Sequence, residues 1–206
     1  MIDVIDNALP ESIFNKLSKE AIDKDFPWYM GNDIDPDTID KKLNTGITLD
    51  KNTIPSFQFF HVFYSMADDE TREKGINSNF FNLYNKPIFT FLENYKLGKK
   101  LQLFKSKLNL LTNIHNFKSN DLYNIPHLDV TTDHISVLLY LNDSDGDTTF
   151  FNERFIDEKR PNSLTIKQKV SPKKNRMVIS NGYFHASANP IQSNYRVVYN
   201  GVFIDT

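Results

Sequence analysis

The sequence contains no cysteine, and this absence narrows the chemistry open to the protein. Disulfides, thiolate metal sites and a cysteine nucleophile are all excluded. Any metal ion that the chain binds must therefore be held by histidine and carboxylate side chains.

Long apolar runs and a strong net charge of either sign are also missing. No apolar run approaches the roughly 18 residues of a membrane span, and the start, MIDVIDNALPESIF, lacks the basic and apolar regions of a signal peptide. The net charge is −2 and the isoelectric point is near 6.2, which gives no general reason to bind nucleic acid or anionic membranes. We therefore expect a cytoplasmic protein (in a host cytoplasm if it is virus-encoded) with no nucleic-acid or membrane partner.

The sequence is rich in aromatic side chains and long enough to bury them. Its 206 residues include 17 Phe and 9 Tyr against one Trp, and 39% are hydrophobic. This is enough chain for one domain with a substantial core, and we see no repeat, low-complexity tract or domain boundary. The sequence therefore predicts a single domain over residues 1–206, with a support region of helix and strand at 1–100 and a core at 101–206.

Helical periodicity is confined to the first hundred residues. The run PESIFNKLSKEAI has apolar side chains three to four residues apart with charges opposite, which predicts a helix. Its apolar face is formed by Ile13, Leu17 and Ala21 or Ile22. A second run, NFFNLYNKPIFTFLENY, carries an aromatic stripe that predicts a helix on the outside of a sheet, with a kink at Pro87.

Strand-like segments dominate the rest of the chain. SFQFFHVFYS is apolar on both faces and predicts a buried strand, in which we interpret His61 as a core histidine. From Leu101 onward, short apolar segments recur between turn residues: LQLFKSKLNLL, HISVLLYLND, DTTFFNE, SLTIKQKV, RMVISNG and YRVVYNGVFI. The pattern predicts a mainly β fold, a double-stranded β-helix (jelly roll) braced by N-terminal α-helices. The acidic residues 33–50 predict a surface excursion or lid.

One motif carries chemistry. The run YNIPHLDVTTDHI places His127 and Asp129 two residues apart, and on a strand such residues point to the same side. His185 follows downstream, after RMVISNGYF. Two imidazoles and one carboxylate suit one face of an octahedral Fe(II) and leave three positions open for small molecules. Adjacent residues on a strand point apart, so we interpret His134, next to Asp133, as structural.

Arg196 is the single charge in the strand-like run YRVVYNGVFI. A buried cation needs a fixed anion, and two interpretations stay open. Arg196 forms an internal salt bridge, or its planar fork holds the carboxylate of a ligand. Tyr140 and Thr148 lie on other predicted strands and have hydroxyls that can donate to the same carboxylate.

Together these residues resemble a known family. The order H-x-D, then YLNDSDGDTTF, then a distal His followed by Arg, is similar to that of the Fe(II)/2-oxoglutarate-dependent dioxygenases. Within them it is most similar to the prolyl-4-hydroxylase-like group, with its small bacterial and phage members. The resemblance covers residues 108–204. It implies that the iron ligands are His127, Asp129 and His185. It also implies that Arg196 binds the distal carboxylate of 2-oxoglutarate in a pocket lined by Tyr140 and Thr148.

Two positions depart from the family pattern. The family's G-G-E-T is DGDT at residues 145–148, and Phe117 stands where a tyrosine often bonds the co-substrate, so a hydrogen bond from that position is lost. The resemblance implies an enzyme that uses Fe(II), 2-oxoglutarate and O₂ to hydroxylate a substrate, with release of succinate and CO₂ and stimulation by ascorbate. Because Asp129 occupies the carboxylate position, hydroxylation is favoured over halogenation.

The substrate and two other protein classes stay open. Peptidyl proline is the family default, but another protein side chain, a free amino acid or a small metabolite fits as well, and we expect residues 33–50 and 57–64 in the substrate wall. A cupin-like metal enzyme would show more clustered histidines and no keto-acid pocket lined by arginine. In a non-catalytic jelly-roll binding module, the presence together of His127, Asp129, His185 and Arg196 would be a coincidence. An iron site requires three ligand atoms that converge within about 2.0–2.3 Å of a common point.

Overall fold

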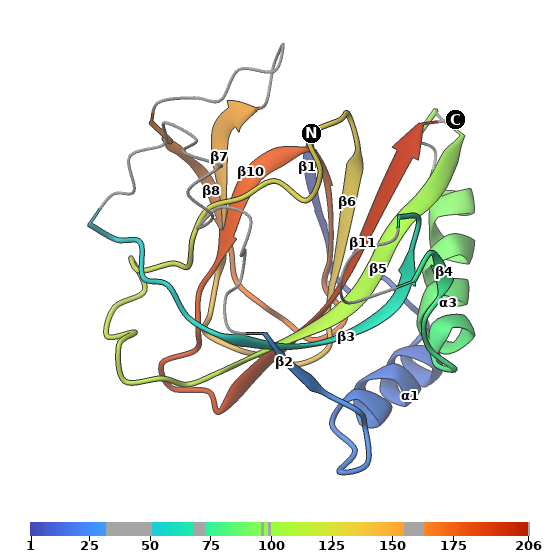
Figure 1. Ribbon diagram of the computed structural model, residues 1–206, viewed down its shortest axis with the longest axis horizontal. Coiled ribbons are helices and arrows are strands. Elements are labelled where there is room, and N and C mark those ends of the chain that lie inside the picture. The colour runs from blue at the N-terminus through green and yellow to red at the C-terminus, as the bar shows by residue number, and fades with distance from the viewer. Residues whose placement is uncertain (32–50, 68–72, 96, 99, 155–162, 206) are drawn as a thin grey trace.

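In the part of the chain that the structure describes, two antiparallel sheets face each other, and two helices cover the outer side of the larger one (Figure 1). The structure is a computed structural model that describes residues 1–31, 51–67, 73–95, 97, 98, 100–154 and 163–205. The prediction of a mainly β jelly roll braced by N-terminal helices is confirmed. The acidic stretch at 33–50 lies outside the described residues.

The larger sheet has β11 and β5 near its centre. Its strands follow the order β1 (Ile2–Ile5), β9 (Met177–Asn181), β6 (Ile135–Tyr140), β11 (Tyr195–Asp205), β5 (Leu101–Thr112), β3 (Gln58–Ser65) and β2 (Tyr29–Gly31), with β4 (Gly75–Ile76) beside β3. The smaller sheet follows the order β10 (Tyr183–Ser187), β7 (Thr148–Arg154) and β8 (Ile166–Val170). The helices are α1 (Glu11–Ala21) and α3 (Phe81–Asn94).

The largest part of the core lies between the helices and the larger sheet. Helix α1 buries Phe14, Leu17 and Ala21. The predicted face was wrong at one position, because Ile13 is 39% exposed and the larger Phe14 is inside. The Tyr84 hydroxyl of α3 donates to the Leu17 carbonyl oxygen at 2.9 Å, which joins the two helices. The helices therefore hold the outer face of the sheet that carries β5 and β11.

Helix α3 continues through Pro87. Its buried side packs on the sheet, and this packing was predicted. Phe63 of β3 stacks on Tyr84 with ring centroids 4.7 Å apart. His61 of the same strand is 5% exposed, and its two ring nitrogens bond the Pro27 carbonyl oxygen and the Ser78 hydroxyl. Its interpretation as a core histidine is confirmed.

The register between β5 and β11 determines which side chains face the interior between the sheets. Asn109 of β5 lies opposite Val198 of β11, and Lys107 lies opposite Asn200. Because successive side chains on a strand alternate, residues at every second position share the inner face. On β11 these are Arg196, Val198 and Asn200, while Tyr199 points to the helices, where its hydroxyl donates to Asn85 of α3.

Strands β1 and β2 were not predicted. They have four and three residues, too few for a periodic signal, and they are stabilised by pairing with β9 and β3. The first hundred residues therefore contribute strands to the same sheet as the later part of the chain.

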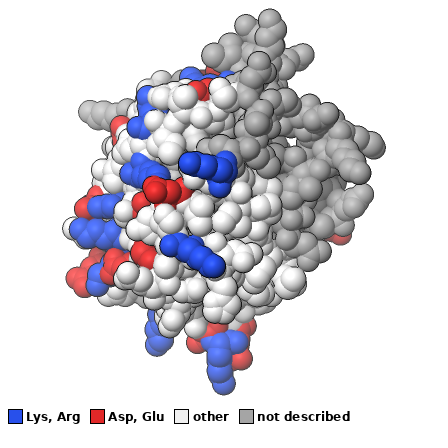
Figure 2. Space-filling model, turned by 90° about the vertical axis from the view of Figure 1, so that its left-hand side faces the viewer, with Lys and Arg blue, Asp and Glu red and all other residues white. Residues whose placement is uncertain are grey.

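The charged surface is mixed in sign. On the face shown in Figure 2, Lys and Arg side chains lie among Asp and Glu and form no continuous basic surface. Arg176 donates to both oxygens of Asp6, which Lys173 also contacts, and Lys169 contacts Asp121. Within the described residues, no helix is long and apolar enough to cross a membrane.

Candidate metal centre and adjoining cavity

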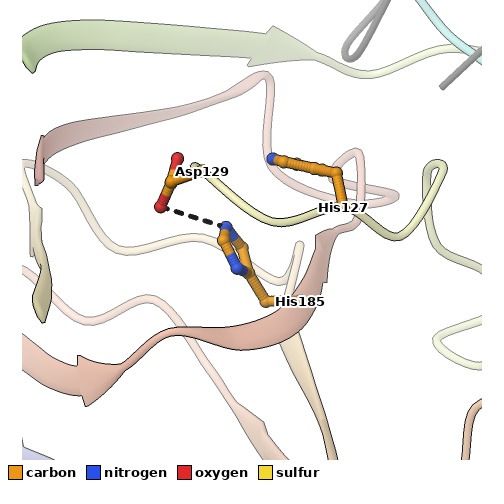
Figure 3. A group of neighbouring side chains, drawn as sticks. All are labelled: His127, Asp129 and His185. Carbon is orange, nitrogen blue, oxygen red and sulfur yellow. Dashed lines mark ion pairs between the residues drawn. The ribbon is translucent and has the colours of Figure 1, made fainter. Parts of the chain in front are cut away.

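His127, Asp129 and His185 converge, with their ligand atoms within 4.8 Å of one another. Figure 3 shows the three side chains pointing toward a shared centre, with His185 projecting from β10. Asp129 Oδ2 lies 3.7 Å from His185 Nε2, and the two imidazole centroids are 4.7 Å apart. Ligands at about 2.1 Å from one ion and at right angles lie about 3 Å apart. The ligand atoms are farther apart than this, so the three side chains must move closer together to hold a first-row metal.

The H-x-D segment is not a strand, contrary to the prediction. A single antiparallel bridge joins His127 to His185. The two residues exchange backbone hydrogen bonds at 2.9 and 3.0 Å. Beyond the bridge the pairing is irregular, because the N–H of Asn124 bonds the Ser187 carbonyl oxygen at 2.8 Å. The bridge, not a strand, brings the two imidazoles to one place.

Both imidazoles present Nε2 to the centre. His127 Nδ1 lies 3.1 Å from the Ile125 carbonyl oxygen, and His185 Nδ1 lies 3.1 Å from the Tyr183 carbonyl oxygen. A carbonyl can only accept, so each Nδ1 carries a proton, and Nε2 is the atom with the lone pair in the neutral form of each ring. Burial, opposed by the attraction of Asp129, lowers the pKa of His185 to about 4. His185 is therefore neutral at neutral pH, as a metal ligand must be.

Three side chains hold Asp129. The Ser136 hydroxyl donates to Oδ2 at 2.8 Å, and Asn200 Nδ2 donates to Oδ1 at 3.1 Å. Lys105 Nζ donates to the Asp129 main-chain oxygen at 2.7 Å and lies 3.7 Å from Oδ1. Burial by itself raises the pKa of this carboxyl, but Lys105 and the neighbouring imidazoles outweigh it and hold the pKa well below its ordinary value. Asp129 is therefore an ionised carboxylate held in a fixed orientation, as a metal ligand needs to be.

A cavity extends from the metal centre to Arg196. It is lined by Gln58, Lys107, Asn109, Leu111, His127, Leu138, Thr148, His185, Ser187, Arg196, Val198 and Asn200. Thr148 and Arg196 were predicted to line it. Tyr140 was also predicted there, but it is fully buried behind the lining, and its hydroxyl bonds Thr148 Oγ1 at 2.7 Å.

Arg196 has no carboxylate of the described residues within ion-pair distance, although its side chain is almost completely buried. Its Nη2 donates to Thr148 Oγ1 at 2.7 Å, and its guanidinium carbon lies 5.4 Å from the centre of the Tyr140 ring. Its Nε has no hydrogen-bond partner in the described part of the chain. Burial lowers the pKa of this guanidinium, which nevertheless stays charged at neutral pH. The internal salt bridge considered from the sequence is not found there.

Several site residues were missed from the sequence. Lys107 and Asn109 line the cavity, and Lys105 contacts Asp129. The alternation of polar and apolar residues along LFKSKLNLL was the available signal, but alternation alone does not distinguish a face in water from a face on a cavity. Gln58, within the predicted substrate wall at 57–64, also lines the cavity.

Two other polar or aromatic candidates lie outside the centre. His134 is 6% exposed, and its Nδ1 bonds the Thr132 carbonyl oxygen at 2.7 Å, which fits its structural interpretation. Phe117 is buried and does not line the cavity. The position at which the family often has a tyrosine therefore contributes nothing to this cavity.

No protein-family model and no curated protein matches the sequence. Solved structures do match. A 2OG-Fe(II) oxygenase family oxidoreductase from Burkholderia pseudomallei superposes with a TM-score of 0.61 at 11% identity, over 98% of this chain and 84% of that one. The fold is that of the 2-oxoglutarate/Fe(II) oxygenases.

Two further structures share this fold. The epimerase SnoN in complex with Fe3+, alpha ketoglutarate and nogalamycin RO gives a TM-score of 0.58 at 14% identity, over 99% of this chain and 78% of that one. A Trichoplax adhaerens prolyl hydroxylase in complex with a hypoxia inducible factor peptide gives 0.57 at 12% identity, over 99% and 83%. The shared fold thus occurs with both peptide and small-molecule ligands.

Proposed function

We propose that this chain is an Fe(II)- and 2-oxoglutarate-dependent dioxygenase, with residues 1–206 acting as one catalytic domain. The observation that carries the proposal is a buried arginine, without a carboxylate partner among the described residues, in a cavity that is also lined by the two imidazoles of a His-Asp-His cluster. A buried guanidinium needs an anion, and a ligand carboxylate can supply it. A keto acid that reaches from Arg196 to the metal centre satisfies both ends of the cavity.

The donor set fits Fe(II). Two neutral imidazoles and one carboxylate are the ligands typical of non-haem iron oxygenases, which leave adjacent positions open. When bound, Fe(II) with 2-oxoglutarate and O₂ supplies the oxidising chemistry, which yields succinate, CO₂ and one hydroxyl group on the substrate. We expect ascorbate to stimulate turnover.

The protein's own residues bind and orient. In this proposal His127, Asp129 and His185 hold the iron, with both Nε2 atoms directed by hydrogen bonds at Nδ1. Arg196 and Thr148 bind the distal carboxylate of 2-oxoglutarate. Tyr140 holds the Thr148 hydroxyl in place from behind.

Apolar side chains complete the co-substrate end of the cavity. Leu111, which lies opposite Arg196, and Val198, two residues along β11, line the cavity there and limit the access of water to the buried charge. A drier site strengthens the interaction between the guanidinium and a carboxylate.

We propose hydroxylation of a peptidyl proline, another protein or amino-acid side chain, or a small metabolite. The solved structures that share the fold hold a peptide in one case and nogalamycin RO in another, which supports a substrate from these classes. Asp129 fills the carboxylate position, which favours hydroxylation over halogenation.

The two alternative classes are less well supported. A cupin-like enzyme would have more clustered histidines, but His127, Asp129 and His185 form the one cluster of three potential metal ligands within the described ranges. A non-catalytic module does not require a buried, carboxylate-free arginine beside that cluster.

The test is an anaerobic titration of metal-free protein with Fe(II) and then with 2-oxoglutarate. We expect a weak visible charge-transfer band from the keto acid chelate, and its loss in His185→Ala. The matched control is His134→Ala, which removes a buried histidine outside the cluster and should keep the band. A folded wild-type protein that gives no band would overturn the proposal.

A further inference from the structure

Three buried polar atoms without hydrogen-bond partners line the same cavity. They are Arg196 Nε, Asn109 Oδ1 and Asn200 Oδ1. Six such side-chain atoms occur in the part of the chain that the structure describes, so half of them lie around one small space. A buried polar group without a partner costs about 1–3 kcal/mol. Their concentration around one cavity indicates that this space takes a polar ligand.

The strand register places Asn109 between the two ends of the cavity. Asn109 lies opposite Val198, which is two residues from Arg196 and two residues from Asn200. Arg196 lies at one end of the cavity, and at the other end Asn200 contacts Asp129, the proposed metal ligand. A ligand that extends from Arg196 to the metal centre therefore passes beside Asn109.

The two asparagines differ in what fixes their amides. Asn200 must direct its N–H toward Asp129, because a carboxylate only accepts. Asn109 Oδ1 has no hydrogen-bond partner among the described residues, and the two ends of an amide can be exchanged by rotation, so Asn109 can direct its NH₂ group into the cavity. The neighbouring position on the same face, Lys107, also lines the cavity and lies opposite Asn200. From Arg196 toward the metal centre, the cavity is therefore lined first by the amide of Asn109 and then by the cation of Lys107, which suits an anion at the end that meets the metal.

We propose that Asn109 is a co-substrate-binding residue, and that its side-chain N–H donates a hydrogen bond to the metal-proximal carboxylate of 2-oxoglutarate. The inference rests on the proposed function, since it names a further contact in the same cavity. Phe117 has an apolar side chain and does not line the cavity, so it makes no hydrogen bond there. Asn109 of β5 would supply such a hydrogen bond. Arg196 then selects the distal carboxylate, and Asn109 orients the end that meets the metal.

The test compares two keto acids in anaerobic Fe(II)-loaded protein. The charge-transfer band is titrated with 2-oxoglutarate and with pyruvate, which has no distal carboxylate. We expect Asn109→Leu to weaken both keto acids by the same factor, about 10- to 100-fold, as for a lost hydrogen bond to a charged group. Arg196→Leu should weaken 2-oxoglutarate far more than pyruvate. Fe(II) affinity without keto acid should stay unchanged in Asn109→Leu.

Two further variants sharpen the test. Asn109→Asp keeps the side-chain shape but opposes a carboxylate with a carboxylate, so its loss should exceed that of Asn109→Leu. Gln102→Leu removes an exposed amide from the same strand, and should leave both affinities unchanged.

The outcomes separate this inference from the proposed function. Unchanged keto acid affinities in Asn109→Leu and Asn109→Asp would overturn the role of Asn109, and so would a loss confined to 2-oxoglutarate. A parallel loss of Fe(II) affinity would assign Asn109 to the metal centre instead. Absence of the band in wild-type protein would overturn the proposed function itself.

Discussion

The two faces of β11 differ in what they contact. On the helix side, Tyr199 is completely buried and its hydroxyl bonds Asn85 of α3. On the cavity side, Arg196 and Asn200 are as deeply buried, yet each has a polar atom without a partner in the described structure. One face of the strand therefore contributes to stability through complete packing. The other face has polar groups that line the cavity, so substitutions on the two faces should have separable effects.

The largest expected effect is at the metal centre. Asp129→Ala removes the one carboxylate of the ligand set and should abolish Fe(II) binding and reduce turnover to background. The far-ultraviolet circular dichroism spectrum should stay that of the wild type, because Asp129 lies outside the strands. Metal content after Fe(II) loading and gel filtration measures the first effect. Retained iron would contradict the ligand assignment.

The opposite result is expected on the helix side. Phe63→Ala removes a completely buried ring that stacks on Tyr84, and should lower the free energy of unfolding by about 3–5 kcal/mol. Fe(II) affinity should be unchanged under conditions where the variant is folded. Urea unfolding gives the first quantity and Fe(II) titration the second.

The matched control for Phe63→Ala is Tyr29→Ala, which removes an aromatic ring that is 58% exposed and should cost about 1 kcal/mol or less. An Fe(II) affinity that falls with stability in Phe63→Ala would show that the two faces are coupled.

Arg196→Leu should weaken the binding of 2-oxoglutarate without lowering the stability of the ligand-free protein. We expect the 2-oxoglutarate concentration at half-maximal turnover to rise about 100-fold, because a charge-assisted bidentate contact is lost. Without keto acid, the free energy of unfolding should not fall, since a buried cation without a carboxylate partner is itself destabilising. Steady-state kinetics and urea unfolding supply the two values.

The control for Arg196→Leu is Arg176→Leu, which removes an arginine that is paired with Asp6 at the surface and should leave the 2-oxoglutarate requirement unchanged. A clear loss of stability in Arg196→Leu without ligand would point to an ion pair within the protein.

The smallest effect is expected at the pair of Asp6 and Arg176. Hydrogen bonds from Arg176, and then from Lys173, lower the pKa of Asp6 from 3.8 to about 2. A depressed carboxyl pKa stabilises the folded state above pH 4, and this contribution is lost as the pH falls toward 2. Asp6→Asn should therefore cost less than about 1 kcal/mol at pH 6, since the pair is exposed to solvent, and still less at pH 3. Urea unfolding at both pH values measures the difference. A deficit that grows on acidification would contradict the assignment.

Much of the fold followed from the sequence because its signals are local. Period-2 segments predicted the jelly-roll strands, and apolar spacing predicted both helices. The predicted buried face of α1 included Ile13, but Phe14 is buried instead. Spacing alone does not reveal which of two adjacent apolar residues packs against the sheet. Strands β1 and β2 depend on partners far along the chain, so no short-range pattern indicates them.

The candidate site was predictable only in part for the same reason. His127, Asp129, His185 and Arg196 have a recognisable order. The side chains that hold Asp129 do not, because Asn200 is 71 residues away along the chain and its contact depends on the packing of β11. Asn109 could not be predicted for another reason. A polar residue on a strand with alternating polar and apolar side chains is expected to face solvent, and only the structure shows that this face lines a cavity.

The bridge between His127 and His185 links the metal centre to backbone opening. Each residue's amide hydrogen is bonded to the carbonyl of the other, so neither amide can exchange with solvent while the bridge is closed. A metal ion held by both side chains would oppose that opening, because separating the two backbones would break its coordination. Deuterium uptake at these two amides should therefore slow sharply when metal is added. This gives a readout of metal occupancy that needs neither substrate nor oxygen.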